Sequence, residues 1–102
     1  MINITKKGNR VKIEGHTDST ICAAISTIMY TCYNILTEYD PKSIEMNDSL
    51  ENGKDFDNVE VILRRNDKNT SIVWHVMCLE FEKVATDNPQ NVTYEDKNKD
   101  IN

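Results

Sequence analysis

Two residues near the start of the sequence have the types and the spacing that thiol chemistry needs. His16 leaves the end of a predicted strand, and Cys22 stands in the first turn of a predicted helix. A helix N-terminus carries about half a positive charge and unpaired backbone N–H groups, which favour the thiolate form of a cysteine placed there. A folded-back loop can bring the imidazole to the sulfur, since six residue steps reach up to ~20 Å when extended. The pair is a candidate base and nucleophile.

The neighbours of Cys22 extend this hypothesis. The backbone N–H groups of Cys22 and Ala23 could hold the oxyanion that forms when an acyl carbon becomes tetrahedral. The small side chains of Ala23 and Ala24 would let a substrate backbone come close. The alternative is a buried core thiol, because Cys22 lies three residues before Ile25 on an apolar stripe and free cysteines are usually buried.

This segment resembles the signature of a known family, the ribosomal-processing cysteine proteases (Prp). Gly15-His16, followed by Cys22-Ala23-Ala24-Ile25-Ser26, is similar to the family's Gly-His at the end of the second strand and its Val-Cys-Ala-Ala-Val-Ser at the start of the long helix. Ile21 matches the apolar residue before the cysteine. Further along, Phe81–Ala85 and Asn88-Pro89 are similar to the family's second helix and the proline that ends it.

The resemblance implies a homodimeric endopeptidase that removes an N-terminal extension from a large-subunit ribosomal protein, without a cofactor. It implies His16 as the general base and Cys22 as the nucleophile. Ser26 matches a family serine that either supports the dyad or is only structural. Asp18 either stands in for an aspartate of the family's loop or serves as the helix N-cap.

The chain departs from the family between the two residues of the dyad. Only five residues, Thr17 to Ile21, intervene, and none is glycine, whereas family members have a longer loop with a Gly-x-Asp near its end. The deletion would remove a lid over the substrate channel. It suggests a divergent copy, carried by a phage or prophage, whose substrate is a capsid or scaffold precursor. The alternative is a catalytically inactive dimer that binds a peptide or a ribosomal partner.

A metal site is a further alternative. His75 and Cys78 are three residues apart on one predicted helix, and His16 with Cys22 could complete a tetrahedral set of zinc ligands. His75 and Cys78 otherwise fit an exposed helix face and a core position.

The elements that position these residues follow from the hydrophobic periodicity. The predicted order is strands 1–6 and 10–14, helix 21–39, strands 43–47 and 59–63, helix 71–86 and strand 92–94. Asp18, Ser19 or Thr20 can cap the first helix, and Asp40-Pro41 stops it. Residues 48–57, with Asn52-Gly53, predict a turn or loop, and residues 95–102 a frayed tail. The ββαββαβ order predicts an α+β fold with two helices on one face of a mainly antiparallel sheet.

Length and composition bound the function. The chain of 102 residues is expected to form a single domain, 1–102. Its net charge of -5 argues against a nucleic-acid partner, because phosphate contacts need clustered Lys and Arg. No stretch approaches the ~18 apolar residues of a membrane span, and the N-terminus lacks the apolar core of a signal peptide, so no membrane partner is expected. The three cysteines form no disulfide framework, and we expect a cytoplasmic protein.

Overall fold

A computed structural model describes residues 1–48 and 56–97 of the chain. The elements are β1 (Ile2–Lys7), β2 (Arg10–Gly15), α1 (Ser19–Tyr39), β3 (Ile44–Asp48), β4 (Phe56–Leu63), α2 (Lys68–Asp87) and β5 (Val92–Asp96). Their order is the predicted ββαββαβ.

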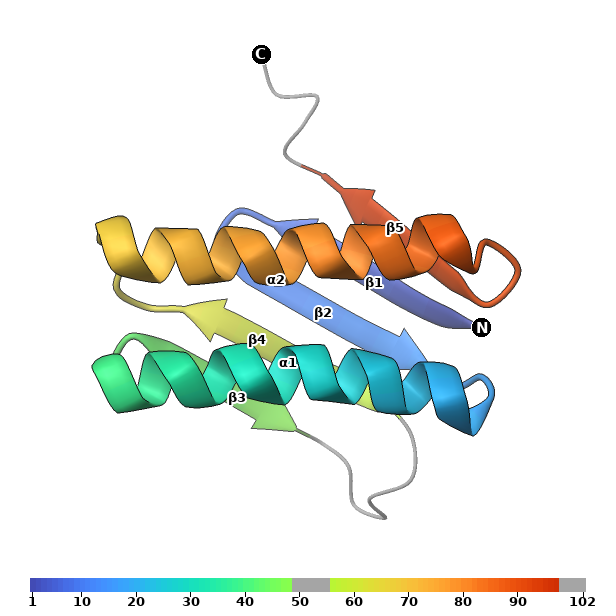
Figure 1. Cartoon of the computed structure of the whole chain (residues 1–102), viewed down its shortest axis with the longest axis horizontal. Helices are drawn as coiled ribbons and strands as arrows, with labels where there is room; N and C mark the ends of the chain where they lie inside the picture. The colour runs from blue at the N-terminus through green and yellow to red at the C-terminus, as the bar shows by residue number, and fades with distance from the viewer. Residues whose placement is uncertain (49–55, 98–102) are drawn as a thin grey trace.

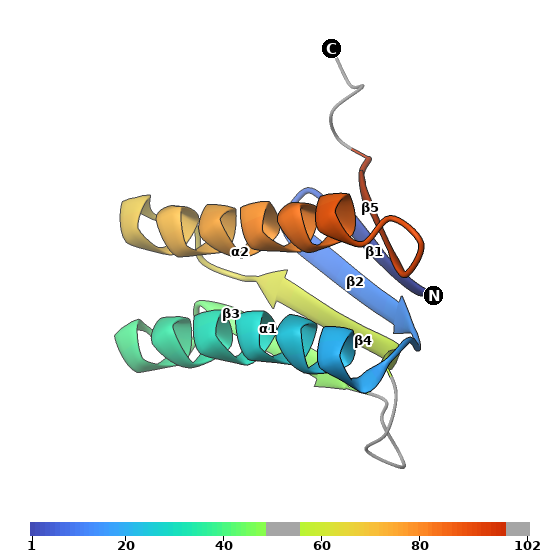
Figure 2. The same ribbon diagram turned by 45° about the vertical axis from the view of Figure 1, so that its right-hand side comes forward.

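The strands form one sheet in the order β3-β4-β2-β1-β5. Every pairing is antiparallel except that of β1 with β5. Both helices lie side by side on the same face of this sheet and run in opposite directions (Figures 1 and 2). The predicted fold class, α+β with two helices on one face of a mainly antiparallel sheet, is confirmed.

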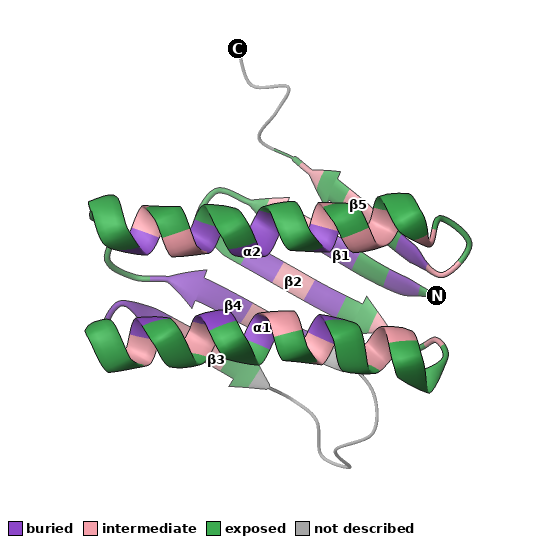
Figure 3. Cartoon of the chain, viewed as in Figure 1, coloured by how far each residue is buried: buried purple, intermediate pink, exposed green. Residues whose placement is uncertain are grey.

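The core lies between the sheet and the two helices. Alternate residues of the strands point into it, among them Ile2 and Ile4 of β1, and the purple bands of Figure 3 mark these buried positions. From α1 the stripe Ile25, Met29, Cys32 and Leu36 packs onto the sheet, at the spacing of one face of a helix. Each fully buried aliphatic side chain contributes about 1.5–3 kcal/mol.

Helix α1 starts two residues earlier than the periodicity predicts. Asp18 is the N-cap, and its side chain accepts a hydrogen bond from the backbone N–H of Ile21 at 3.0 Å. Of the three candidate caps, therefore, it is Asp18 that caps the helix. At the other end, Asp40 is the C-cap, as the proline after it requires.

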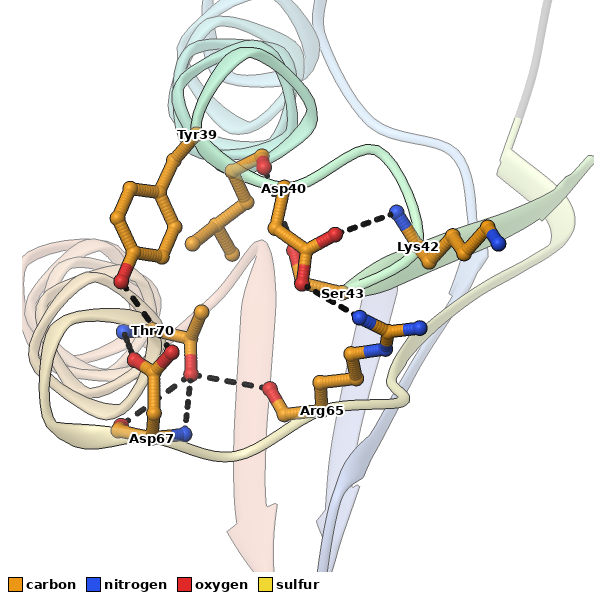
Figure 4. Close-up of polar contacts among 8 residues, drawn as sticks. Tyr39, Asp40, Lys42, Ser43, Arg65, Asp67 and Thr70 are labelled. Atoms are coloured by element: carbon orange, nitrogen blue, oxygen red, sulfur yellow. Dashed lines mark hydrogen bonds and ion pairs between the residues drawn. The ribbon is translucent and has the colours of Figure 1, made fainter.

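Polar contacts join the C-terminal end of α1 to the N-terminal end of α2 (Figure 4). Asp67 caps α2 by accepting from the N–H groups of Asn69 and Thr70, each at 2.9 Å. The hydroxyl of Tyr39, the last residue of α1, donates to the other oxygen of Asp67 at 3.3 Å. The N–H of Thr70, above all, holds the pKa of Asp67 below its usual value. Because the folded pKa is the lower one, this contribution to stability is complete above the unfolded pKa and is lost as the pH falls through the folded pKa.

Thr70 and Ser43 are the buried polar residues of the described chain, and both have partners. The Thr70 hydroxyl accepts from the N–H of Asp67 at 2.8 Å and contacts the carbonyl of Arg65 at 3.0 Å. The Ser43 hydroxyl donates to the carbonyl of Leu36 at 3.2 Å. The Ser43 bond joins the α1–β3 connection to α1, and the Thr70 bonds join the β4–α2 connection to α2 (Figure 4).

Strands β4 and β5 extend furthest beyond their predicted limits. β4 begins at Phe56, although residues 48–57 were expected to form a loop; residues 49–55 lie outside the described residues. β5 continues through Glu95 and Asp96, which pair with Thr5 and Lys6 of β1. The expected frayed tail is therefore wrong for these two residues, because backbone pairing and the Lys6–Asp96 ion pair at 3.8 Å hold them. Residues 98–102 lie outside the described residues.

The expectation that no segment matches a membrane span is also wrong. Within residues 1–48 and 56–97, α1 is the one helix whose length and composition would suffice, with a mean hydropathy of 1.3 over its best window. A core helix passes the same test, and one side of α1 carries the buried stripe that packs on the sheet.

The buried hydroxyl of Thr70 provides a test of the helix-end contacts. We expect Thr70→Val to lower the free energy of unfolding by about 1–3 kcal/mol, because it leaves the Asp67 N–H without its acceptor. Urea unfolding measures this. The control is Thr86→Val in the same helix, where an exposed hydroxyl bonds only to the carbonyl of Glu82, and a change within about 0.5 kcal/mol is expected. Equal effects of the two substitutions would contradict a stabilising role for the bond between Asp67 and Thr70.

Candidate active site

The candidate base and nucleophile lie on either side of a short linker. His16, Thr17 and Asp18 connect the end of β2 to the start of α1. This linker, the first residue of the chain and the turn between α2 and β5 all lie at the same end of the molecule (Figures 1 and 2). The structure therefore brings His16 and Cys22 to one end of the helix–sheet sandwich.

Gly15 is required where the chain leaves β2. Its φ is +112°, and a Cβ built there would lie 2.1 Å from the carbonyl oxygen of Met1. Only glycine tolerates both the left-handed backbone and this close approach. The Gly-His pair of the sequence motif thus has a geometric reason: Gly15 lets β2 pass against Met1, and His16 follows at a fixed point.

The linker is anchored to the start of β1 and to the α2–β5 turn. The N–H of His16 donates to the Met1 carbonyl at 3.3 Å. The hydroxyl of Thr17 accepts from Nδ2 of Asn91 at 2.8 Å, across 74 positions of sequence. The imidazole-bearing residue His16 itself is exposed. Asn91 carries no signal in the local sequence pattern, because it lies 74 positions from Thr17.

Cys22 donates its backbone N–H to a backbone carbonyl one turn earlier in the chain. That N–H donates to the Asp18 carbonyl at 3.1 Å, so the expectation that it helps to hold an oxyanion is wrong. The side chain of Asp18 occupies the N–H of Ile21. Ser19 and Thr20 hold the first two helical positions, whose N–H groups have no acceptor within the helix.

The Cys22 thiol is half-buried beside the linker. Its Sγ donates to the carbonyl oxygen of Thr17 at 3.6 Å. Ala23 and Ala24 are exposed next to it, and Ser26 is half-buried one turn further along α1. That these small side chains leave room for a substrate backbone stays a prediction.

The other two cysteines are core residues. Cys32 and Cys78 are 7% and 5% exposed, respectively. Burial raises the pKa of Cys32, with a further contribution from Glu80, and burial raises the pKa of Cys78 to about 11. Both thiols are therefore poor nucleophiles near neutral pH.

The alternative metal site is not assembled. His75 and Cys78 line a cavity of about 230 Å³ beside β5, together with Lys6, Leu79, Glu82, Tyr94 and Asp96. Neither His16 nor Cys22 lines it. In the part of the chain that the structure describes, no three His, Cys, Asp or Glu side chains are grouped so that they could hold a metal ion.

Comparison of the sequence with protein families gives one match. The model of the family described as Cysteine protease Prp matches residues 1–93, which contain the linker, both helices and the start of β5. Comparison with curated proteins finds no match.

Solved structures share the fold. The ribosomal processing protease Prp from S. aureus, in complex with a covalently linked product peptide, is 16% identical with a TM-score of 0.81, over 95% of this chain and 100% of that one. Its complex with a substrate peptide gives 13% identity and a TM-score of 0.78 over the same shares. SMU.848 from Streptococcus mutans is 17% identical with a TM-score of 0.74, over 93% of this chain and 90% of that one.

The burial of the three thiols predicts which of them reacts. We expect N-ethylmaleimide at pH 7 to modify Cys22 in the folded protein at least about a hundredfold faster than Cys32 or Cys78, since burial and thiolate fraction limit the other two. Mass spectrometry of the digested protein measures the three rates. Unfolded protein is the control, in which all three should react alike. Similar rates in the folded state would contradict the assigned environments.

Proposed function

The chain belongs to the Prp cysteine protease family, and from that premise we propose that it is an endopeptidase with Cys22 as the nucleophile and His16 as its base. The observation that carries the proposal is the position of Cys22. It is the half-buried cysteine of the three, at the start of a helix and beside the linker that holds the histidine of the family motif.

The chemistry follows from these two side chains. His16 takes the proton of the Cys22 thiol, and the sulfur attacks the scissile carbonyl carbon. The C–N bond breaks as the imidazolium returns the proton to the leaving amine, which leaves a thioester on Cys22. Water, deprotonated by His16, then attacks the thioester, and the carboxylic acid product leaves as the thiol re-forms.

The Cys22 thiol has to leave its hydrogen bond with Thr17 before its proton can pass to His16. The thiol donates to the carbonyl of Thr17, so the sulfur has to turn from that oxygen when its proton goes to the imidazole. Catalytic hydrogen bonds are often long or misaligned without substrate and tighten in the complex. Ser26 is placed one turn along α1, where its hydroxyl can support the dyad.

For the substrate we propose a protein chain, either a ribosomal protein with an N-terminal extension or a phage capsid or scaffold precursor. The S. aureus relatives hold a product peptide and a substrate peptide, and the exposed Ala23 and Ala24 leave space for a peptide here. The short linker supports the phage substrate, since it leaves the thiol more open than a long loop would. We propose a cytoplasmic location, because three free thiols suit a reducing compartment.

Cleavage assays test the enzyme. The protein is incubated with an extended ribosomal precursor and with a capsid precursor from the same genome, and products are identified by mass spectrometry. We expect one precursor to be cut, His16→Ala to slow cutting by about 10²–10⁴-fold, and Cys22→Ala to abolish it. Cys22→Ser keeps the size of the side chain and serves as the folding control. Cutting that persists in Cys22→Ala would contradict the proposal.

A second candidate is a binding homologue without catalysis. The short linker and the hydrogen bond of the thiol to Thr17 favour it. This candidate predicts that a precursor co-elutes with the wild-type protein uncut, and that Cys22 reacts no faster in the wild type than in His16→Ala.

We also propose that the protein is a homodimer joined through the outer face of its helices. Ile72, Val76 and Leu79 of α2 are 55%, 46% and 49% exposed, and Ile35 of α1 is 48% exposed. We call these four residues the outer patch. They support an interface, because exposed apolar residues that gather on one side of a helix mark contact surfaces.

The lack of charged residues along most of α1 favours a second copy of this chain as the partner at the interface. No Asp, Glu, Lys or Arg occurs from Ser19 to Thr37, yet only 22% of its most apolar window is buried in the chain. A two-fold interface sets a surface against itself, so charges near the axis meet their own sign. An uncharged face suits that arrangement, whereas it gives a charged partner nothing to pair with.

Light scattering after gel filtration tests this dimer. We expect a mass of twice the 11.8 kDa of the chain, and a monomer for Val76→Glu, which would bury a charge in the interface. The matched control is Gln90→Glu in the exposed α2–β5 turn, which should stay dimeric. A monomeric wild type, or a dimer that Val76→Glu leaves intact, would rule out this interface.

A further inference from the structure

The hydrogen bond between Asn91 and Thr17 joins the end of the fold to the linker of the candidate active site. Nδ2 of Asn91 donates to Oγ1 of Thr17 at 2.8 Å, and the contact is partly buried. Thr17 lies between His16 and Asp18, and its carbonyl is the acceptor for the Cys22 thiol. One side chain from the last connection of the chain thus reaches the residue that sits between the proposed base and the proposed nucleophile.

Asn91 is a firm support for this contact, because its backbone is held on both sides. Its carbonyl accepts from the N–H of Ile2 at 2.8 Å, and its N–H donates to the carbonyl of Asn88 at 3.0 Å. The residue that follows, Val92, begins β5, which pairs with β1 in the sheet. The amide of Asn91 is therefore carried by the sheet rather than by a free loop.

The rest of the linker is anchored at its two ends. On one side, Met1 holds the backbone of His16: the N–H of His16 donates to the Met1 carbonyl at 3.3 Å, and the His16 carbonyl accepts from the N-terminal ammonium of Met1 at 2.6 Å. On the other, Asp18 is fixed as the helix cap. Asn91 supplies the side-chain contact at the middle residue, so its loss would release the Thr17 side chain and leave the peptide between Thr17 and Asp18 freer to turn.

We propose that Asn91 is a positioning residue that, through Thr17, holds the linker so that the imidazole of His16 can reach the Cys22 thiol. The inference rests on the proposed dyad. Asn91 does not contact the sulfur; it acts by fixing the Thr17 side chain and, with it, the backbone that carries the base. A displacement of about 1 Å in such a group costs roughly a hundredfold in rate, so a partial loosening should be measurable.

Alkylation of Cys22 by iodoacetamide at pH 7 is the test, because it needs no identified substrate. The rate at Cys22 is measured by mass spectrometry in the wild type, Asn91→Ala, Thr17→Val and the double variant. We expect each single substitution to slow the reaction by about tenfold, since the base is no longer held beside the thiol. The double variant should be no slower than either single one, because both remove the same hydrogen bond.

Three further variants separate positioning from general damage. Thr17→Ser keeps the accepting hydroxyl and should keep the wild-type rate, and Gln90→Ala in the same turn is the matched surface control. His16→Ala tests the proposed function itself. Melting temperatures show whether each variant folds. If Asn91→Ala does not fold, Thr17→Val still tests the proposal.

The outcomes separate cleanly. If His16→Ala is slow while Asn91→Ala and Thr17→Val react at the wild-type rate or faster, this inference is overturned and the dyad stands. Additive losses in the double variant also overturn it, because the two residues then act separately. If His16→Ala reacts like the wild type, the proposed function fails, and the positioning role fails with it.

Discussion

The backbone of Gly15 passes against the backbone of Met1, and this close approach determines where the chain leaves the sheet. No side chain fits between the two segments, and the positive φ at Gly15 would strain any other residue. His16 consequently begins the linker from the edge of β1 and not from a free loop end. The helix cap at Asp18 then fixes the other end of the linker. A connection with two fixed ends and three residues has few conformations, which is why the Cys22 thiol lies directly beside the linker.

The element order could be predicted because each element keeps a clear period. The buried stripe of α1 recurs at helical spacing, and alternate residues of β1 and β2 face the core. The hydrophobic pattern missed those strand residues that are held by backbone pairing although the local sequence is polar. Glu95 and Asp96 have the composition of a solvated tail, yet their backbone pairs with β1 and Asp96 meets the Lys6 ammonium. Phe56 begins a strand although polar residues follow it.

The candidate site was predictable only in its local part. His16 and Cys22 stand close together in the sequence, and the Gly-His and Cys-Ala-Ala motifs identify them. The contact from Asn91 comes from 74 positions away, and single-sequence periodicity has no access to such a pair. Sequence spacing also did not determine whether the N–H of Cys22 is free to bind a substrate oxygen. Because Asp18 is the cap, the N–H of Cys22 bonds to it and is not available to a substrate oxygen.

Fold and family together leave one chemical question at the centre of the account, whether His16 activates Cys22. The most direct measurement is the rate at which a peptide vinyl sulfone forms a covalent adduct, followed by intact mass and located by peptide mapping. We expect a single adduct, on Cys22, that forms at least about a hundredfold more slowly in His16→Ala. Equal rates in the two proteins, or an adduct on Cys32 or Cys78, would contradict it.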